Sequence, residues 1–147
     1  MRKEAIILIA EDDDGHFALV RKNLQRSGIW NEVIRFADGQ EALDFLFRQG
    51  PGPHREASKE YLLLLDIRMP KVDGVELLEK IKQDPELRKI PVIMLTTTDD
   101  PREVERCHSL GCSIYIVKPV EYEEFIDAIR KIGLFLSVVE VPRINGS

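Results

Sequence analysis

Cysteine is scarce in this sequence, and its scarcity excludes two kinds of small protein. Only Cys107 and Cys112 occur among 147 residues, too few for the disulfide framework of a small secreted domain. No histidine or cysteine lies around them at the spacing of a zinc finger. We therefore expect two reduced thiols in the core of a cytoplasmic protein.

An excess of positive charge is also missing. Lysine and arginine number 21 against 26 acidic residues, which gives a net charge of -5. Proteins that bind nucleic acids or membrane surfaces favour basic patches, so we expect neither partner. No apolar run approaches the ~20 residues that cross a bilayer. The apolar segment 5–10 is too short for a secretory signal and leads straight into acidic residues.

What the sequence does contain is the composition of one globular domain, with 44% hydrophobic and 32% charged residues. Short apolar segments alternate with amphipathic helical segments, a pattern typical of a parallel sheet with helices on both faces. We expect a single domain over residues 1–147, with its core at about 5–136 and a short tail at 137–147. Strands are expected at 5–10, 33–36, 61–65, 91–95 and 113–117, with helices that begin near 14, 38, 73, 100 and 122.

The central strand is expected at residues 61–65, where four consecutive leucines end at Asp66. An apolar run this short, followed by a turn at Pro70, indicates a strand that is buried on both faces. Its carboxyl end presents one acid at the edge where open α/β sheets bind ligands. A carboxylate there can attack phosphorus and form an aspartyl phosphate. We therefore predict that Asp66 is a nucleophile that accepts a phosphoryl group.

Other charged and hydroxyl side chains follow the neighbouring strands. The acids 11–14 follow the first strand, Thr96 follows the fourth, and Lys118 follows the fifth; parallel strands bring these ends to one edge. Crowded carboxylates raise one another's pKa unless a cation joins them, and Mg²⁺ prefers such oxygen ligands. The metal and Lys118 would offset the charge of the phosphoryl oxygens, to which Thr96 would donate a hydrogen bond. This spacing by itself predicts metal-assisted phosphate chemistry.

Four segments together resemble the receiver domain of response regulators, the phosphorylated proteins of two-component signalling. They lie at 6–13, 65–74, 91–97 and 118–119, in the order typical of that family, and the run Asp-x-x-Met-Pro-x-x-Asp-Gly begins at Asp66. The resemblance spans residues 5 to about 136. It implies a flavodoxin-like α/β fold, in which a five-stranded parallel sheet of order 2-1-3-4-5 carries helices on both faces.

The resemblance also assigns roles around the nucleophile. Asp66 would be the phospho-acceptor, and Mg²⁺ would be bound by Asp12, Asp66 and the backbone carbonyl of Arg68. Glu11, where the family more often has aspartate, would act through a metal-bound water. Arg68 and Thr98 each lie two residues beyond a motif residue, so they would border the path of the hydrolytic water and tune the lifetime of the phosphate.

Thr96 and Lys118 would hold the phosphoryl group, and Tyr115 would be the aromatic switch residue whose orientation follows Thr96. The peptide bond between Lys118 and Pro119 would be cis, as in the family. Phosphorylation would repack the surface of the fourth helix, the fifth strand and the fifth helix, through which we expect a homodimer. The chain would catalyse only its own phosphorylation and dephosphorylation, so we expect a signalling protein and not an enzyme.

The phosphoryl donor implied by the resemblance is a histidine kinase. The long segment 49–60, the stretch 89–97 and the tail at 139–142 further resemble the stand-alone receivers that partner bacterial phytochromes. A bacterial phytochrome is thus a candidate donor, and no output domain is expected. Because segment 49–60 is rich in glycine, proline and mixed charges, we expect an exposed connector there, with a partner-specific contact as the alternative.

Two other interpretations share this chemistry or this fold. A Mg²⁺-dependent phosphatase can use an aspartate nucleophile, but such enzymes place it after the first strand in an Asp-x-Asp-x-Thr/Val pattern, and residues 12–16 lack the downstream threonine. A flavin-binding module needs a loop that cradles phosphate after the first strand, where the acids 11–14 would repel phosphate. Turnover of a phosphate ester would favour the first alternative, and a yellow cofactor would favour the second.

Overall fold

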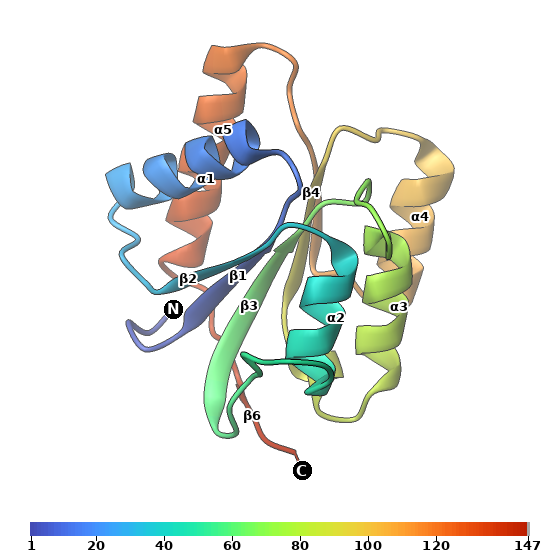
Figure 1. Cartoon of the computed structure of the whole chain (residues 1–147). Coiled ribbons are helices and arrows are strands. Elements are labelled where there is room, and N and C mark those ends of the chain that lie inside the picture. The colour runs from blue at the N-terminus through green and yellow to red at the C-terminus, as the bar shows by residue number, and fades with distance from the viewer. Residues whose placement is uncertain (147) are drawn as a thin grey trace.

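Five parallel strands form the centre of the molecule, in the order β2-β1-β3-β4-β5 (Figure 1). This order confirms the prediction from the sequence and places β3 between β1 and β4. The computed structural model describes residues 1–146, so Ser147, the last residue of the predicted tail, lies outside it. The strands are β1 (Ile6–Ala10), β2 (Val33–Phe36), β3 (Lys59–Leu65), β4 (Val92–Thr96) and β5 (Ile114–Val117).

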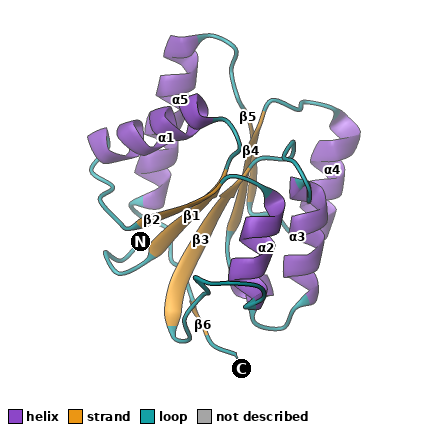
Figure 2. Ribbon diagram, viewed as in Figure 1, coloured by secondary structure: helices purple, strands orange, loops and turns teal. Residues whose placement is uncertain are grey.

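Helices cover both faces of this sheet, as Figure 2 shows. Two of them, α1 (Asp14–Arg26) and α5 (Tyr122–Leu136), lie together on one face. The other face carries α2 (Gly39–Phe47), α3 (Gly74–Gln83) and α4 (Pro101–Leu110), and a 3-10 turn, η1 (Leu87–Lys89), leads into β4. Among the helices of residues 1–146, none combines the length and the apolar character needed to cross a membrane.

β3 is buried on both faces, as its run of leucines predicts. Leu62 and Leu64 pack with the residues of α1 and α5, while Leu63 and Leu65 pack with those of α2 and α3. Each of these leucines is at most 1% exposed, and burial of one such side chain contributes about 1.5–3 kcal/mol. Two hydrophobic layers therefore fix the strand that ends at Asp66.

Four helices begin with an aspartate whose side chain accepts a hydrogen bond from a backbone N–H of the first turn. Such a cap satisfies a donor that the helix leaves unpaired and contributes about 1 kcal/mol. In α2, Asp38 Oδ1 accepts from the N–H of Glu41 at 2.8 Å, and Glu41 Oε2 accepts from the N–H of Ala37, the residue before the cap, at 2.9 Å. The capping residues are Asp13, Asp38, Asp73 and Asp100.

Most of the segment 49–60 is exposed, as predicted for a connector, but Arg55 and Glu60 within it are buried. Arg55 is buried, and its guanidinium donates from Nε to the carbonyl of Leu46 and from Nη1 to the carbonyl of Asn145, both at 2.9 Å. A buried cation must be satisfied by hydrogen bonds, and these carbonyls supply them. The mixture of glycine, proline and charge in this segment gives no sign of that contact, because the partner Asn145 lies 90 positions away.

The tail also contributes to the fold. A short strand, β6 (Arg143–Ile144), pairs antiparallel with the start of β3, at the lower end of the sheet in Figure 1. Arg48 Nη1 donates to the carbonyl of Gly146 at 2.9 Å, and the N–H of Asn145 donates to Glu86 Oε1 at 2.7 Å. The described part of the tail therefore joins the sheet edge opposite the carboxyl ends of the strands.

Candidate functional site

The carboxyl ends of β1, β3, β4 and β5 meet at one edge of the sheet (Figure 2), and the predicted site residues directly follow these ends in the sequence. The backbone N–H of Asp66 donates to the carbonyl of Ala10 at 3.1 Å, so the end of β3 is tied to β1. The N–H of Lys118 donates to the carbonyl of Thr96 at 2.7 Å, so the end of β5 is tied to β4. Ordinary sheet hydrogen bonds thus continue one residue beyond the strands and position these side chains.

Three carboxylates gather at this edge. Glu11, Asp12 and Asp66 each offer an oxygen, and these oxygens all lie within 4.8 Å of one another. Glu11 is 4% exposed and Asp66 is 9% exposed, whereas Asp12 faces solvent. Carboxylate oxygens at this spacing fit a hard divalent cation such as Mg²⁺. The structure therefore brings together the three side chains predicted as metal ligands; the predicted carbonyl ligand, that of Arg68, lies two positions beyond Asp66 on the same loop.

Lys118 supplies the counter-charge inside this cluster. It is 4% exposed, and its ammonium donates hydrogen bonds to Glu11 Oε1 and, at 3.3 Å, to Asp66 Oδ2. Burial raises the pKa of the Glu11 carboxyl, and the hydrogen bond from Lys118 opposes that rise. Three carboxylates against one ammonium leave the cluster negative, which favours the entry of a further cation.

The hydroxyl and the aromatic residue predicted for the switch lie next to this cluster. Thr96 is fully buried, and its Oγ1 accepts a hydrogen bond from the N–H of Thr98 at 3.4 Å. Tyr115 is partly buried, and its Oη donates to the carbonyl of Thr98 at 2.6 Å. Burial raises the pKa of Tyr115 to about 12. Both side chains therefore hold the loop that follows β4.

A glycine fixes the loop after Asp66. The N–H of Gly74 donates to the carbonyl of Ile67 at 2.7 Å, which draws the start of α3 against this loop. A Cβ atom at position 74 would lie 2.1 Å from the carbonyl oxygen of Asp66, closer than any side chain permits. Each residue of the Asp-Gly pair at 73–74 therefore has a structural role. Asp73 caps α3, and Gly74 allows the start of α3 to lie against the backbone of Asp66.

The predicted cis bond before Pro119 is wrong. Among residues 1–146 the cis peptide bond is the one between Gly52 and Pro53, and the bond between Lys118 and Pro119 is trans. An X-Pro bond prefers trans by about 0.5–1 kcal/mol unless its surroundings favour the other isomer. Lys118 contacts Asp66 from the trans form.

Two residues that the sequence analysis did not single out also lie in the site. His16 Nδ1 lies 3.3 Å from Lys118 Nζ and 3.8 Å from Glu11 Oε1. Arg35 Nη2 donates to the carbonyl of Glu11 at 3.0 Å and to that of Asp12 at 3.3 Å. The signal for Arg35 was present as a lone charge in the otherwise apolar strand Val33–Phe36, whereas a histidine in the first turn of a helix gives no comparable signal.

The residues predicted to tune the phosphate lifetime contact each other. Arg68 Nε donates to Thr98 Oγ1 at 3.2 Å, so the loop after β3 is joined to the loop after β4. This contact is exposed. Because Arg68 and Thr98 follow Asp66 and Thr96 at the same spacing, the pair lies at the border of the site.

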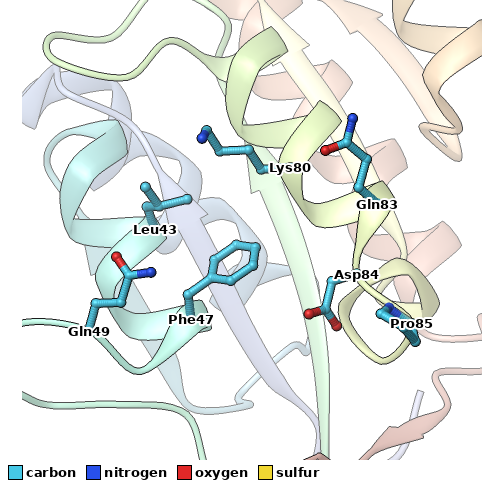
Figure 3. Close-up of a pocket in the computed structure, with 7 residues that line it drawn as sticks. All are labelled: Leu43, Phe47, Gln49, Lys80, Gln83, Asp84 and Pro85. Atoms are coloured by element: carbon cyan, nitrogen blue, oxygen red, sulfur yellow. The ribbon is translucent and has the colours of Figure 1, made fainter.

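Two surface hollows of about 370 Å³ each differ in their relation to this site. The first lies between α2 and the end of α3, where Leu43 and Phe47 face Lys80 and Asp84 (Figure 3). No predicted site residue lines it, so it does not belong to the site. The second is lined by Lys118 together with His16, Val120 and Tyr122, and it opens beside the carboxylate cluster.

Comparison with known families matches residues 7–130 to the response regulator receiver domain. Among individual relatives, the response regulator Rcp1 of Synechocystis is 35% identical over 138 residues, a stretch that covers 93% of this chain and 92% of Rcp1. The Mn²⁺-bound form of Rcp1 has a TM-score of 0.83 at 34% identity, with 93% of this chain and 98% of that chain covered.

Two further solved structures are similar over nearly the whole chain. A response regulator receiver domain from Rhodospirillum rubrum has a TM-score of 0.90 at 46% identity and covers 96% of this chain and 99% of its own. The phosphorylated cyanobacterial phytochrome response regulator RcpA has a TM-score of 0.84 at 33% identity, with coverages of 93% and 97%. Together with the strand order and the cluster at the sheet edge, these matches establish that the chain belongs to the response regulator receiver family of two-component signalling.

Proposed function

We propose that this chain is a phospho-accepting response regulator in which Asp66 takes a phosphoryl group from a histidine kinase. One observation carries the proposal. Asp66 lies at the end of the central strand, 9% exposed, with two carboxylates within 4.8 Å and the ammonium of Lys118 at 3.3 Å from its Oδ2. A nucleophile, a cation site and a counter-charge therefore converge at one point.

The transfer step needs no proton from the protein. A carboxylate oxygen of Asp66 forms a bond to phosphorus while the bond from phosphorus to the imidazole nitrogen of the donor breaks. The electron pair of that bond stays with the nitrogen, and Asp66 becomes an acyl phosphate. Reaction with water later cleaves the new bond and returns the carboxylate and inorganic phosphate.

The protein would promote the transfer by positioning the reacting groups and by offsetting the charge of the phosphoryl oxygens. Glu11, Asp12 and Asp66 would hold Mg²⁺, which contributes positive charge for the phosphoryl oxygens when it is bound. Lys118 would move its hydrogen bond from Asp66 to a phosphoryl oxygen, and the hydroxyl of Thr96 would donate to another. The roles of these residues rest on their place at the strand ends and on the contacts of Lys118 with both buried acids.

The switch would follow from the movement of Thr96. As its hydroxyl turns toward the phosphoryl group, the space that it leaves would admit the ring of Tyr115. The bond from Tyr115 Oη to the carbonyl of Thr98 would then break, which frees the loop before α4. The surface of α4, β5 and α5 would repack, and we propose that this surface binds a second copy of the chain. Exposed apolar side chains at Val117 and Phe135 support an interface on these elements.

The donor is proposed to be a bacterial phytochrome kinase, because RcpA is described as a phytochrome response regulator and resembles this chain along its length. The hollow that is lined by Lys118, Pro119 and Val120 leaves room for the donor's imidazole next to the site. The alternative of an aspartate-nucleophile phosphatase receives no support from the family match, which covers residues 7–130.

The proposal is tested by incubation of the protein with Mg²⁺ and acetyl phosphate, followed by intact mass measurement. Wild type is expected to gain one phosphoryl group, and Asp66→Asn none. Asp13→Asn is the matched control, because Asp13 is a neighbouring acid that caps α1 and lies outside the carboxylate cluster. An adduct in Asp66→Asn, or turnover of a phosphate ester without an adduct, would contradict the proposal.

A further inference from the structure

Arg35 makes a fan of contacts to the acidic segment that follows β1. Its Nε and Nη2 both donate to the carbonyl of Glu11, at 3.1 and 3.0 Å, and Nη2 also donates to the carbonyl of Asp12 at 3.3 Å. Its Nη1 lies 2.6 Å from Asp14 Oδ1. The guanidinium carbon lies 4.9 Å from the centre of the Phe17 ring, so the guanidinium packs over the face of this ring. The side chain of Arg35 therefore contacts four of the seven residues in the segment 11–17.

The position of Arg35 in the sheet explains this reach. Arg35 pairs with Ile9 in the register of β2 and β1, and its neighbours Ile34 and Phe36 pack into the core on the other face. Its side chain therefore extends over the α1 face, past the end of β1. The side chain is 23% exposed, so its hydrogen bonds are only partly screened by water.

These contacts act on the backbone from which two proposed metal ligands project. The carbonyls of Glu11 and Asp12 are held on the side of Arg35, while their carboxylates converge on Asp66. The side chain of Asp13 is separately engaged, because its Oδ1 accepts from the N–H of His16 at 2.9 Å. The backbone of the acidic segment is therefore fixed by the guanidinium on one side and by the helix cap on the other.

We propose that Arg35 is a positioning residue for the divalent cation, which it serves by holding Glu11 and Asp12 in a binding geometry before the ion enters. This inference rests on the proposed function, since it concerns the same cation site. The planar fork of arginine can donate to two carbonyls at once, whereas the ammonium of lysine is a point charge without that geometry. Residues that orient metal ligands typically contribute 10–100-fold to metal affinity.

The ion pair with Asp14 provides a control that separates charge from geometry. Asp14 has a side chain that is 91% exposed, and ion pairs of this kind contribute little. Asp14→Asn removes the charge contact but leaves both carbonyls bound to the guanidinium. Arg35→Lys keeps the positive charge but loses the fork, and Arg35→Gln loses both.

The test is calorimetric titration of the unphosphorylated protein with Mg²⁺, with circular dichroism to verify that each variant is folded. We expect Arg35→Gln to weaken Mg²⁺ binding about tenfold, Arg35→Lys to weaken it severalfold, and Asp14→Asn to leave it within about twofold. We also expect the rate of phosphorylation by acetyl phosphate in Arg35→Gln to approach that of wild type as Mg²⁺ is raised to saturation. A general folding defect would not be rescued in this way.

Three results would overturn the inference. Arg35→Gln with the wild-type Mg²⁺ affinity would remove the role of Arg35 altogether. Full restoration by Arg35→Lys would leave charge as the cause and exclude positioning. A loss in Asp14→Asn as large as that in Arg35→Gln would assign the effect to the ion pair. Wild type that binds Mg²⁺ but takes no phosphoryl group at Asp66 would contradict the proposed function and leave the role of Arg35 intact.

Discussion

Lys118 faces two buried acids at once, and this arrangement determines the electrostatics of the site. Its ammonium offsets part of the charge of Glu11 and Asp66, which would otherwise repel each other across the end of β3. The remaining negative charge attracts a divalent cation. In the proposed transfer, an incoming phosphoryl group would meet a lysine that is already in place and needs only to exchange one acceptor for another.

The pKa of Tyr115 leads to a prediction at the scale of one residue. Burial raises this pKa from 10.0 to about 12. As the pH rises above about 10, tyrosine in the unfolded chain loses its proton while Tyr115 in the folded chain keeps it. The contribution of Tyr115 to stability is therefore complete below pH 10, and it is lost progressively up to about pH 12, by up to about 1.4 kcal/mol per pH unit.

Tyr115→Phe should remove this pH dependence. At neutral pH the variant should lose only about 1 kcal/mol, the usual net contribution of one hydrogen bond, here the bond to the carbonyl of Thr98. Urea unfolding at several pH values measures both effects, and the ultraviolet absorbance of tyrosinate measures the ionisation. Equal slopes of stability against pH in wild type and variant would contradict this assignment.

Arg68 and Thr98 lead to a prediction about the lifetime of the phosphate. Their contact at 3.2 Å spans two loops at the border of the site, and its removal should admit the hydrolytic water more readily. We expect Arg68→Ala and Thr98→Ala each to speed dephosphorylation severalfold, and the double variant to add little, because one contact is lost in all three. Release of inorganic phosphate after removal of the donor measures the rates. Unchanged rates in both single variants would remove this role.

At the scale of elements, the sequence predicts most of the sheet because each strand is a short apolar run that ends at a polar residue. The run at 61–65 identifies β3, and the aspartate caps identify the helix starts that follow the strands. The residues of the site were predictable for the same reason, since strand ends are visible in one sequence. Arg35 stood out only as a lone charge in an apolar strand, and its contacts with the carbonyls of Glu11 and Asp12 depend on the register of β2 against β1, which local patterns do not specify.

The contact between the long segment and the tail escaped prediction for a related reason. Arg55 is a charged residue in a stretch rich in glycine and proline, a pattern that indicates exposure. Its burial depends on the carbonyl of Asn145, which the tail brings from 90 positions away. Pairing of β6 with Lys59 and Glu60 likewise involves residues far apart in the sequence.

Arg55 leads to a prediction for the element that it holds. Arg55→Met should lower the free energy of unfolding by about 2–3 kcal/mol, because hydrogen bonds from a charged group are lost and the carbonyl of Leu46 is left buried. Amide hydrogen exchange at β6 should become faster, while phosphorylation of Asp66, at the opposite edge of the sheet, should persist. Lys59→Met, which alters an exposed neighbour, is the matched control. Unchanged exchange at β6 in Arg55→Met would contradict the account.

For the whole molecule, the proposed switch predicts a change in assembly. In the proposed switch, phosphorylation would alter the loop between β4 and α4, and the exposed Val117 lies on the edge strand β5 of the same surface. We expect light scattering to detect a dimer that is strengthened by phosphorylation and weakened by Val117→Arg, since a charge would enter an apolar contact. A monomer with and without a phosphoryl group would exclude this interface.

Asp66 is the residue that we propose receives the phosphoryl group, and chemical trapping tests this assignment most directly. Sodium borohydride reduces the acyl phosphate of an aspartate to homoserine, which peptide mass mapping locates. After incubation with Mg²⁺ and acetyl phosphate, we predict homoserine at position 66 and at no neighbouring aspartate. Homoserine at position 12 or 13, or its absence from a protein that has gained a phosphoryl group, would contradict the account.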